Sequence, residues 1–284
     1  MLTTLDLCKA GEEALDAECW ADAGRLFAEA VEREPSCVNA WSGLASALEK
    51  QRLYAEARAA YERVLTFEER QPVLTLLGAV QHHLHDDPAA LVTLRRSLEL
   101  WGDDDEAHYH LGLALRSSDL HASLHHLQES ERLDPTVANT TREIGVTLLW
   151  MKRFDEARAV LDRAVASAPA DPWAHSWRGN ALEYCEQFAD AKAAYLRAAD
   201  LLPDCGLFLA SAARMDSRLG RDADAETLFR RAIASEMDSA IACREYGLFL
   251  RRRGRLTSAR RYLQRAVDLD PDERRARQAL EELG

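Results

Sequence analysis

The hydrophobic pattern of this chain is that of amphipathic helices arranged in pairs. Small and apolar residues recur at i, i+3, i+4 and i+7, the spacing that lines one face of a helix. Two such stripes follow one another near residue 185, at His175, Arg178, Gly179 and Leu182 and then at Ala191, Ala194, Tyr195 and Ala198. Pro203 follows the second stripe. Because proline cannot donate the next backbone hydrogen bond, it predicts the end of that helix.

This pair of predicted helices repeats every 33 or 34 residues. One column of small residues marks the period at Ala23, Ala57, Ala90, Ser123, Ala157, Ala191, Ala225 and Ala259. A second small-residue column lies at Gly11, Ala45, Gly78, Gly112, Gly145, Gly179, Ala213 and Gly247. A bulky column follows the first by four residues, at Phe27, Tyr61, Leu94, Leu127, Leu161, Tyr195, Phe229 and Leu263. We expect the small residues to let two helices approach closely, with the bulky residue filling the adjoining space.

The pattern Trp41-x-x-Leu44-Ala45 … Tyr54-x-x-Ala57-x-x-x-Tyr61 resembles the tetratricopeptide repeat, a helix-turn-helix unit of about 34 residues. The resemblance implies an all-α fold, a right-handed α-solenoid of eight units. We place the units at 4–37, 38–70, 71–104, 105–137, 138–171, 172–205, 206–239 and 240–273. We expect 274–284 to form a short capping helix with a polar outer side, as solenoids need for solubility. This organisation leaves no room for an appended catalytic domain.

Composition narrows the class of protein further. The 284 residues are 47% hydrophobic and 30% charged, with 13 Gly and 8 Pro, which excludes collagen-like and low-complexity chains. No stretch approaches the ~20 apolar residues of a membrane helix, and residues 1–15 lack the apolar core of a signal peptide. The six cysteines contain no C-x-x-C pair, so we interpret them as reduced thiols of a cytoplasmic protein.

Charge is distributed unevenly along the chain. The net charge is −12, but residues 1–205 hold 20 basic and 35 acidic side chains, whereas residues 206–284 hold 16 and 13. An acidic body repels a phosphate backbone, which disfavours nucleic acid as a partner. The basic C-terminal part is suited to an acidic segment of a protein partner.

The sequence contains no motif of a known catalytic or cofactor site. G-x-S-x-G, H-E-x-x-H, a P-loop and G-x-G-x-x-G are all missing. We therefore predict a protein that is not an enzyme, with no catalytic residue, no cofactor and no metal site.

Two polar clusters have features that could instead suggest a metal site. Eight of the nine histidines lie between His82 and His126, and His121 and His125 have an i, i+4 spacing that can hold a metal. No cysteine or carboxylate completes a ligand set, so we interpret them as polar helix surface, with metal binding or pH sensing as the alternative. The acidic run 103–106 is interpreted as a helix N-cap rather than a calcium loop.

Aromatic residues outside the packing stripe are the candidate binding residues. The family resemblance implies that the first helix of each unit lines a concave groove. The first helix of the sixth unit carries a second stripe, formed by Trp173, Trp177, Asn180 and Tyr184. The corresponding face of the fifth unit carries Trp150, Asn139 and Arg142. Large rigid aromatics are typical binding anchors. The alternative is packing between adjacent first helices.

Arginines continue this surface toward the C-terminus. They are Arg214, Arg218, Arg244, Arg251 and Arg252. Arginine forms bidentate pairs, so these residues are predicted to hold carboxylates or phosphates of a bound segment. The alternative is a solvated helix end.

The predicted function is therefore that of a non-enzymatic scaffold that binds a protein or peptide segment in its groove. The partner would place an apolar or aromatic residue near the tryptophans and acidic residues near the arginines. The alternatives are a regulatory subunit or ligand sensor that controls a partner enzyme and, less favoured, nucleic-acid binding. No membrane partner is expected, and the sequence is compatible with a homo-oligomer.

Overall fold

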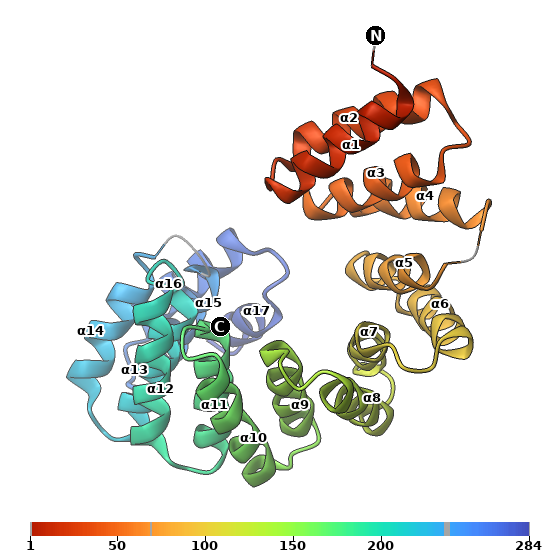
Figure 1. Cartoon of the computed structure of the whole chain (residues 1–284). Coiled ribbons are helices and arrows are strands. Elements are labelled where there is room, and N and C mark those ends of the chain that lie inside the picture. The colour runs from red at the N-terminus through yellow and green to blue at the C-terminus, as the bar shows by residue number, and fades with distance from the viewer. Residues whose placement is uncertain (1, 69, 236–238, 284) are drawn as a thin grey trace. The chain divides into compact units, whose positions relative to one another are not determined.

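A computed structural model of the chain describes residues 2–68, 70–235 and 239–283, and this part of the chain is all-α, without strands (Figure 1). The first eight helices are α1 (Thr4–Asp16), α2 (Trp20–Arg33), α3 (Val38–Lys50), α4 (Tyr54–Leu65), α5 (Gln71–His83), α6 (Asp87–Leu100), α7 (Asp105–Leu115) and α8 (Leu120–Leu133). The remaining helices are α9 (Ala138–Trp150), α10 (Phe154–Ser167), α11 (Pro172–Tyr184), α12 (Phe188–Leu201), α13 (Gly206–Arg218), α14 (Asp222–Ala232), α15 (Ser239–Arg252), α16 (Leu256–Leu269) and α17 (Arg274–Glu281). None of the described helices is both long and apolar enough to span a bilayer.

The helices form two compact units, each of which contains several of the 34-residue repeats. From here on, the first unit is residues 1–140 and the second unit is residues 141–284. In the second unit, the largest group of buried side chains includes Tyr195, Phe208, Met215 and Phe229. The short helix α17 buries Ala276 and Ala279 and exposes its charged side chains. The first unit buries separate groups of apolar side chains, so each unit has an apolar core of its own.

Close approach within the helix pairs depends on the small-residue columns, as the sequence predicted. A Cβ atom added to Gly179 of α11 would lie 2.7 Å from the Tyr195 ring of α12. The same addition at Gly145 of α9 would lie 2.5 Å from Leu161 of α10. Non-bonded carbon atoms approach to about 3.5–4.0 Å, so these positions have no room for a side chain. The bulky column fills the space that the glycines leave.

The turn between paired helices contains a further periodic position. The backbone is left-handed at Glu18, Arg52, His85, Lys152 and Glu186, with φ between 57° and 60°, and also at Gly220 and Gly254. A left-handed conformation costs a residue other than glycine about 1–2 kcal/mol, so the surrounding helix packing enforces this turn. In the turn between α9 and α10, this position is occupied by Lys152.

Candidate functional site

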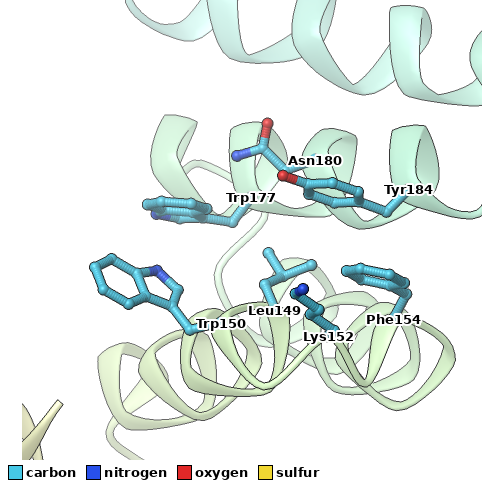
Figure 2. A pocket seen from close by; sticks show the side chains of 7 residues that line it. All are labelled: Leu149, Trp150, Lys152, Phe154, Trp177, Asn180 and Tyr184. Carbon is cyan, nitrogen blue, oxygen red and sulfur yellow. The ribbon is translucent and has the colours of Figure 1, made fainter. Parts of the chain in front are cut away.

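A hollow of about 360 Å³ opens in the second unit between the end of α9, the turn into α10, and α11 (Figure 2). We call it the aromatic hollow; its lining residues are Leu149, Trp150, Lys152, Phe154, Trp177, Asn180 and Tyr184. Four of these seven are aromatic. Trp177, Asn180 and Tyr184 recur at intervals of three and four residues, so α11 projects all three from one face.

The four aromatic rings are arranged as two opposed pairs. At one end of the hollow, Phe154 and Tyr184 are stacked, with ring centroids 4.5 Å apart and planes inclined by 7°. At the other end, Trp150 and Trp177 approach from opposite sides without a ring contact between them in the described structure (Figure 2). Trp150 is 58% exposed and Tyr184 is 60% exposed. This grouping of large apolar side chains at a surface makes the hollow a candidate interaction site.

Asn180, the polar residue that α11 contributes to the hollow, accepts a hydrogen bond from the buried Tyr195. The hydroxyl of Tyr195 donates to Oδ1 of Asn180 at 2.5 Å and lies 3.2 Å from Oε2 of Glu183. Glu183 also accepts a hydrogen bond of 2.8 Å from Arg214. Burial and the nearby Glu183 carboxylate raise the pKa of Tyr195, so its hydroxyl keeps the proton that it donates. Because Oδ1 is the acceptor, the amide nitrogen of Asn180 is left to donate toward the hollow, and Figure 2 shows it on the side of Trp177.

A second hollow adjoins the first and shares Tyr184 with it. This arginine hollow has a volume of about 270 Å³ and is lined by Glu183, Tyr184, Glu186, Phe188, Arg214 and Arg218. The Arg218 guanidinium lies over the Phe188 ring, 5.8 Å from its centroid. Arg252 is exposed overall, but its guanidinium is partly desolvated, and this desolvation lowers its pKa; Glu245 opposes this change, whereas the charges of Arg218, Arg253 and Arg214 add to it. The charges of Arg214 and Arg218 are therefore close enough to act on Arg252, although Glu183 and Glu186 also line the arginine hollow.

The structure brings some of the predicted binding residues together and separates others. Trp150, Trp177, Asn180 and Tyr184 line one hollow, and Arg214 and Arg218 line the next. The ring of Trp173 instead meets Phe208 edge-on, with centroids 5.2 Å apart, and does not line the aromatic hollow. Arg251 pairs with Glu282. Arg252 is exposed.

Arg244 has a structural role in the helix that follows it. Its side chain is only 14% exposed and donates to Glu273 at 2.6 Å and to Glu245 at 2.9 Å. Glu273 in turn caps α17 by accepting from the backbone of Arg275. Arg142 repeats this arrangement, because it pairs with Glu143 and with Asp171, the N-cap of α11. The two arginines are three periods apart in the sequence, a regularity that could have indicated this role.

Sequence reasoning missed three lining residues, Leu149, Lys152 and Phe154. Phe154 belongs to the column of residues that begin the second helix of each pair; this column is apolar except at Asp87 and Asp222, so a structural role is expected there. Lys152 belongs to the left-handed turn column, which includes Arg52 and Glu186. That column has no common side-chain chemistry, and so its period is hard to detect from the sequence.

The histidines of the first unit form contacts with one another. His108 and His126 face each other with their Nδ1 atoms 2.9 Å apart. Burial, together with nearby positive groups, lowers the pKa of His110 and of His126 to about 4. Within the described ranges, no group of three or more His, Cys, Asp or Glu side chains is placed to hold a metal ion. Asp104 caps α7 by accepting from the backbone of Ala107, which confirms the predicted N-cap.

Paired helices that pack through periodic small residues define an all-α helical-repeat protein. The family model described as tetratricopeptide repeat matches residues 8–72, 113–172 and 211–274. The chain therefore belongs to the tetratricopeptide repeat family, as the sequence analysis predicted. A comparison with curated proteins found no match.

Solved structures of this fold resemble the chain. A tetratricopeptide repeat protein from Parabacteroides merdae has 13% sequence identity and a TM-score of 0.68, over 87% of this chain and 98% of that one. Yeast Tom70 has 16% identity and a TM-score of 0.66, over 94% and 58%. YrrB, described as having an unusual peptide-binding site, has 24% identity and a TM-score of 0.50, over 60% and 89%. These likenesses show the fold.

Proposed function

We propose that this protein is a non-enzymatic scaffold that binds a protein or peptide segment through the aromatic hollow. The observation that carries the proposal is the exposure of Trp150 and Tyr184 around a hollow that also contains Trp177. Membership of a family typical of protein–protein interaction supports it, as does the likeness to YrrB, which is described as peptide-binding.

The chemistry of the hollow suits an extended segment. Burying one large apolar side chain of the partner contributes about 1.5–3 kcal/mol, and the aromatic walls are already positioned by helix packing. The amide nitrogen of Asn180 is available to a backbone carbonyl of the segment. A site that is already ordered loses little conformational entropy on binding, so a few such contacts suffice for measurable affinity.

The arginine hollow extends this surface. Arg218 and Arg252 have no ion-pair partner within the described residues, and both are exposed. Acidic residues of the same bound segment would neutralise this region, mainly accelerating association and adding salt dependence.

The test begins with a photo-crosslinking residue at Tyr184, at the rim of the aromatic hollow, and a second at Arg25 on the first unit as the control position. Proteins captured only from Tyr184 are purified, and their affinities are measured directly. We expect Trp177→Ala to weaken binding by about 2 kcal/mol or more, as truncation of a buried anchor does.

Matched variants separate binding from folding. Trp150→Ala should also weaken binding while changing the melting temperature little, because Trp150 is mostly exposed. Trp173→Ala is the control on α11, since its ring packs on Phe208 outside the hollow. If Trp150→Ala and Trp177→Ala bind the purified partner as the unmodified protein does, the proposed function is wrong.

A further inference from the structure

Two cysteines, Cys8 and Cys37, lie in the same apolar region of the first unit. Cys8 is buried on α1, and Cys37 is the N-cap residue of α3. Cys37 packs against the group of buried side chains to which Cys8 belongs. Burial, and after it the neighbouring thiol of Cys37, raises the pKa of Cys8 to about 11. The two thiol groups therefore interact between α1 and α3.

The periodicity of the fold explains why these two side chains meet. They are 29 residues apart, and side chains with this separation contact each other at three further places in the described chain. At each place, a residue in the first half of a helix reaches the N-cap of the helix two places later. These hydrogen-bonded pairs are Thr75 with Asp104, Arg142 with Asp171, and Arg244 with Glu273. Cys8 and Cys37 occupy the same two positions, so the register of the repeats brings their side chains together.

The chemistry of the cysteine pair differs from that of the other three pairs. In those pairs a hydroxyl or guanidinium group donates a hydrogen bond to a carboxylate. A thiol is only a weak donor and a weak acceptor, so the contact between Cys8 and Cys37 provides little hydrogen bonding. Two cysteines can instead form a covalent bond when their Cβ atoms lie about 3.5–4.5 Å apart. Side chains already in contact need little backbone movement to reach that separation.

The two thiols differ in their access to solvent. The side chain of Cys8 is 5% exposed, whereas that of Cys37 is half-buried. An oxidant that arrives from solvent therefore reaches the sulfur atom of Cys37 first. Cys8, whose raised pKa keeps it a thiol at neutral pH, then lies beside the oxidised sulfur atom as the second reactant.

We propose that Cys8 and Cys37 form an oxidative modification site, which hydrogen peroxide converts from two thiols into a disulfide. The sulfur atom of Cys37, having lost its proton to water, attacks one peroxide oxygen, and the O–O bond breaks. The hydroxide that leaves takes up a proton and becomes water, and Cys37 becomes a sulfenic acid. The sulfur atom of Cys8 then attacks that of Cys37 and loses its proton, while the S–O bond breaks and a second water leaves. The two thiols together lose two electrons, which reduce one peroxide to two waters.

The disulfide would fasten α1 to the beginning of α3. The helix α1 packs against both α2 and α3. A covalent bond between Cys8 and Cys37 encloses α2 in a closed loop, which restricts the local opening of these helices. Glutathione would reverse the change by thiol–disulfide exchange. This inference goes beyond the proposed function and does not depend on the aromatic hollow.

The test uses the full chain, first reduced and then treated with a small molar excess of hydrogen peroxide. Remaining thiols are blocked with N-ethylmaleimide, and the protein is digested with trypsin without reduction. Trypsin cleaves after lysine and arginine, which places Cys8, Cys19 and Cys37 on three separate peptides. We expect mass spectrometry to show the peptides of Cys8 and Cys37 linked to each other as the main product, and glutathione to separate them.

Single variants test the order of the two steps. Cys37→Ser should leave Cys8 unoxidised, because Cys8 is buried. Cys8→Ser removes the second reactant, so dimedone should trap at least about tenfold more sulfenic acid at Cys37 than in the unmodified protein. Cys19→Ser is the control, because it removes an exposed cysteine of the same unit, and it should leave the linked peptides unchanged.

Hydrogen exchange measures the structural consequence. Amides of α1 should exchange at least about tenfold more slowly in the oxidised protein than in the reduced protein. The double variant Cys8→Ser, Cys37→Ser should show no such change after peroxide treatment. Linked peptides without slower exchange would refute the restriction of α1.

Other outcomes overturn the modification site itself. A sulfinic acid at Cys37 beside an unmodified Cys8 would mean that the two thiols do not react with each other. A main product that links Cys19 to Cys37 would assign the reaction to a different pair. Resistance of both Cys8 and Cys37 to peroxide would also refute the proposal.

Discussion

The hydroxyl of Tyr195 connects the core of the second unit to the aromatic hollow, and Tyr195→Phe tests that connection. The side chain is fully buried, and its ring occupies the space beside Gly179. Phenylalanine keeps the ring and removes only the oxygen atom, so no large cavity forms. The substitution removes the 2.5 Å hydrogen bond to Oδ1 of Asn180 and the 3.2 Å contact with Glu183.

The expected loss of stability follows from those two contacts. Glu183 keeps its hydrogen bond to Arg214, and Asn180 is only half-buried, so solvent reaches its freed oxygen. A single buried hydrogen bond contributes about 0.5–1.5 kcal/mol, so we expect the free energy of unfolding to fall by about 1–2 kcal/mol. Because the Asn180 amide is then free to rotate, the affinity for the hollow's ligand should also fall, by about threefold to tenfold.

Tyr61→Phe is the matched control. Tyr61 occupies the same column in the first unit, is equally buried, and donates to Oε2 of Glu49 at 2.7 Å. Urea denaturation followed by circular dichroism should show a similar loss of stability in both variants, whereas only Tyr195→Phe should weaken ligand binding. If Tyr195→Phe is destabilised but binds normally, Asn180 is not positioned by Tyr195, and its role as an oriented donor is wrong.

Two further predictions concern packing and pH. Gly179→Leu should destabilise the second unit by about 1–3 kcal/mol or more, because its Cβ alone would lie 2.7 Å from the Tyr195 ring. Gly24→Ala is the control and should change the melting temperature little, because its Cβ would meet only the end of the Gln51 side chain, at 3.2 Å. Equal melting temperatures for the two variants would contradict close packing at Gly179. His110 has a pKa of about 4 in the folded protein, against 6.5 ordinarily. As the pH drops, the imidazole of His110 is therefore protonated in the unfolded state before it is protonated in the folded state. The free energy of unfolding should then fall between about pH 6.5 and pH 4, by up to about 3 kcal/mol for this residue. Urea denaturation at pH 7 and pH 4.5 should show that loss in the first unit, and His110→Gln should reduce it; a pH-independent midpoint would contradict the burial of His110.

Much of the fold follows from local sequence rules. Gly179 and Tyr195 lie 16 residues apart, and their contact was predictable because the same small and bulky residues recur in register at every period. The shared face of Trp177, Asn180 and Tyr184 was likewise predictable, because residues three, four and seven apart on a helix project in the same direction. Trp150 joined them through the period of the repeat. These contacts and shared faces depend only on residue spacing along the chain, so the sequence is sufficient to predict them.

The remaining features depend on which neighbours meet in three dimensions. Trp173 shares a stripe with Trp177, but its ring packs edge-on against Phe208 of the next helix pair. Arg244 is neutralised by Glu273, 29 residues away, and spacing alone does not show which carboxylate an arginine will meet.

The same dependence applies to the polar groups of the aromatic hollow. Lys152 reaches the hollow because of a left-handed turn, and Asn180 presents its nitrogen because Tyr195, on the following helix, donates to its oxygen. Side-chain direction and hydrogen-bond pairing are set by contacts between helices. The sequence alone therefore determined the repeat and the aromatic face, whereas only the tertiary structure decided which polar groups of that face remain free to bind.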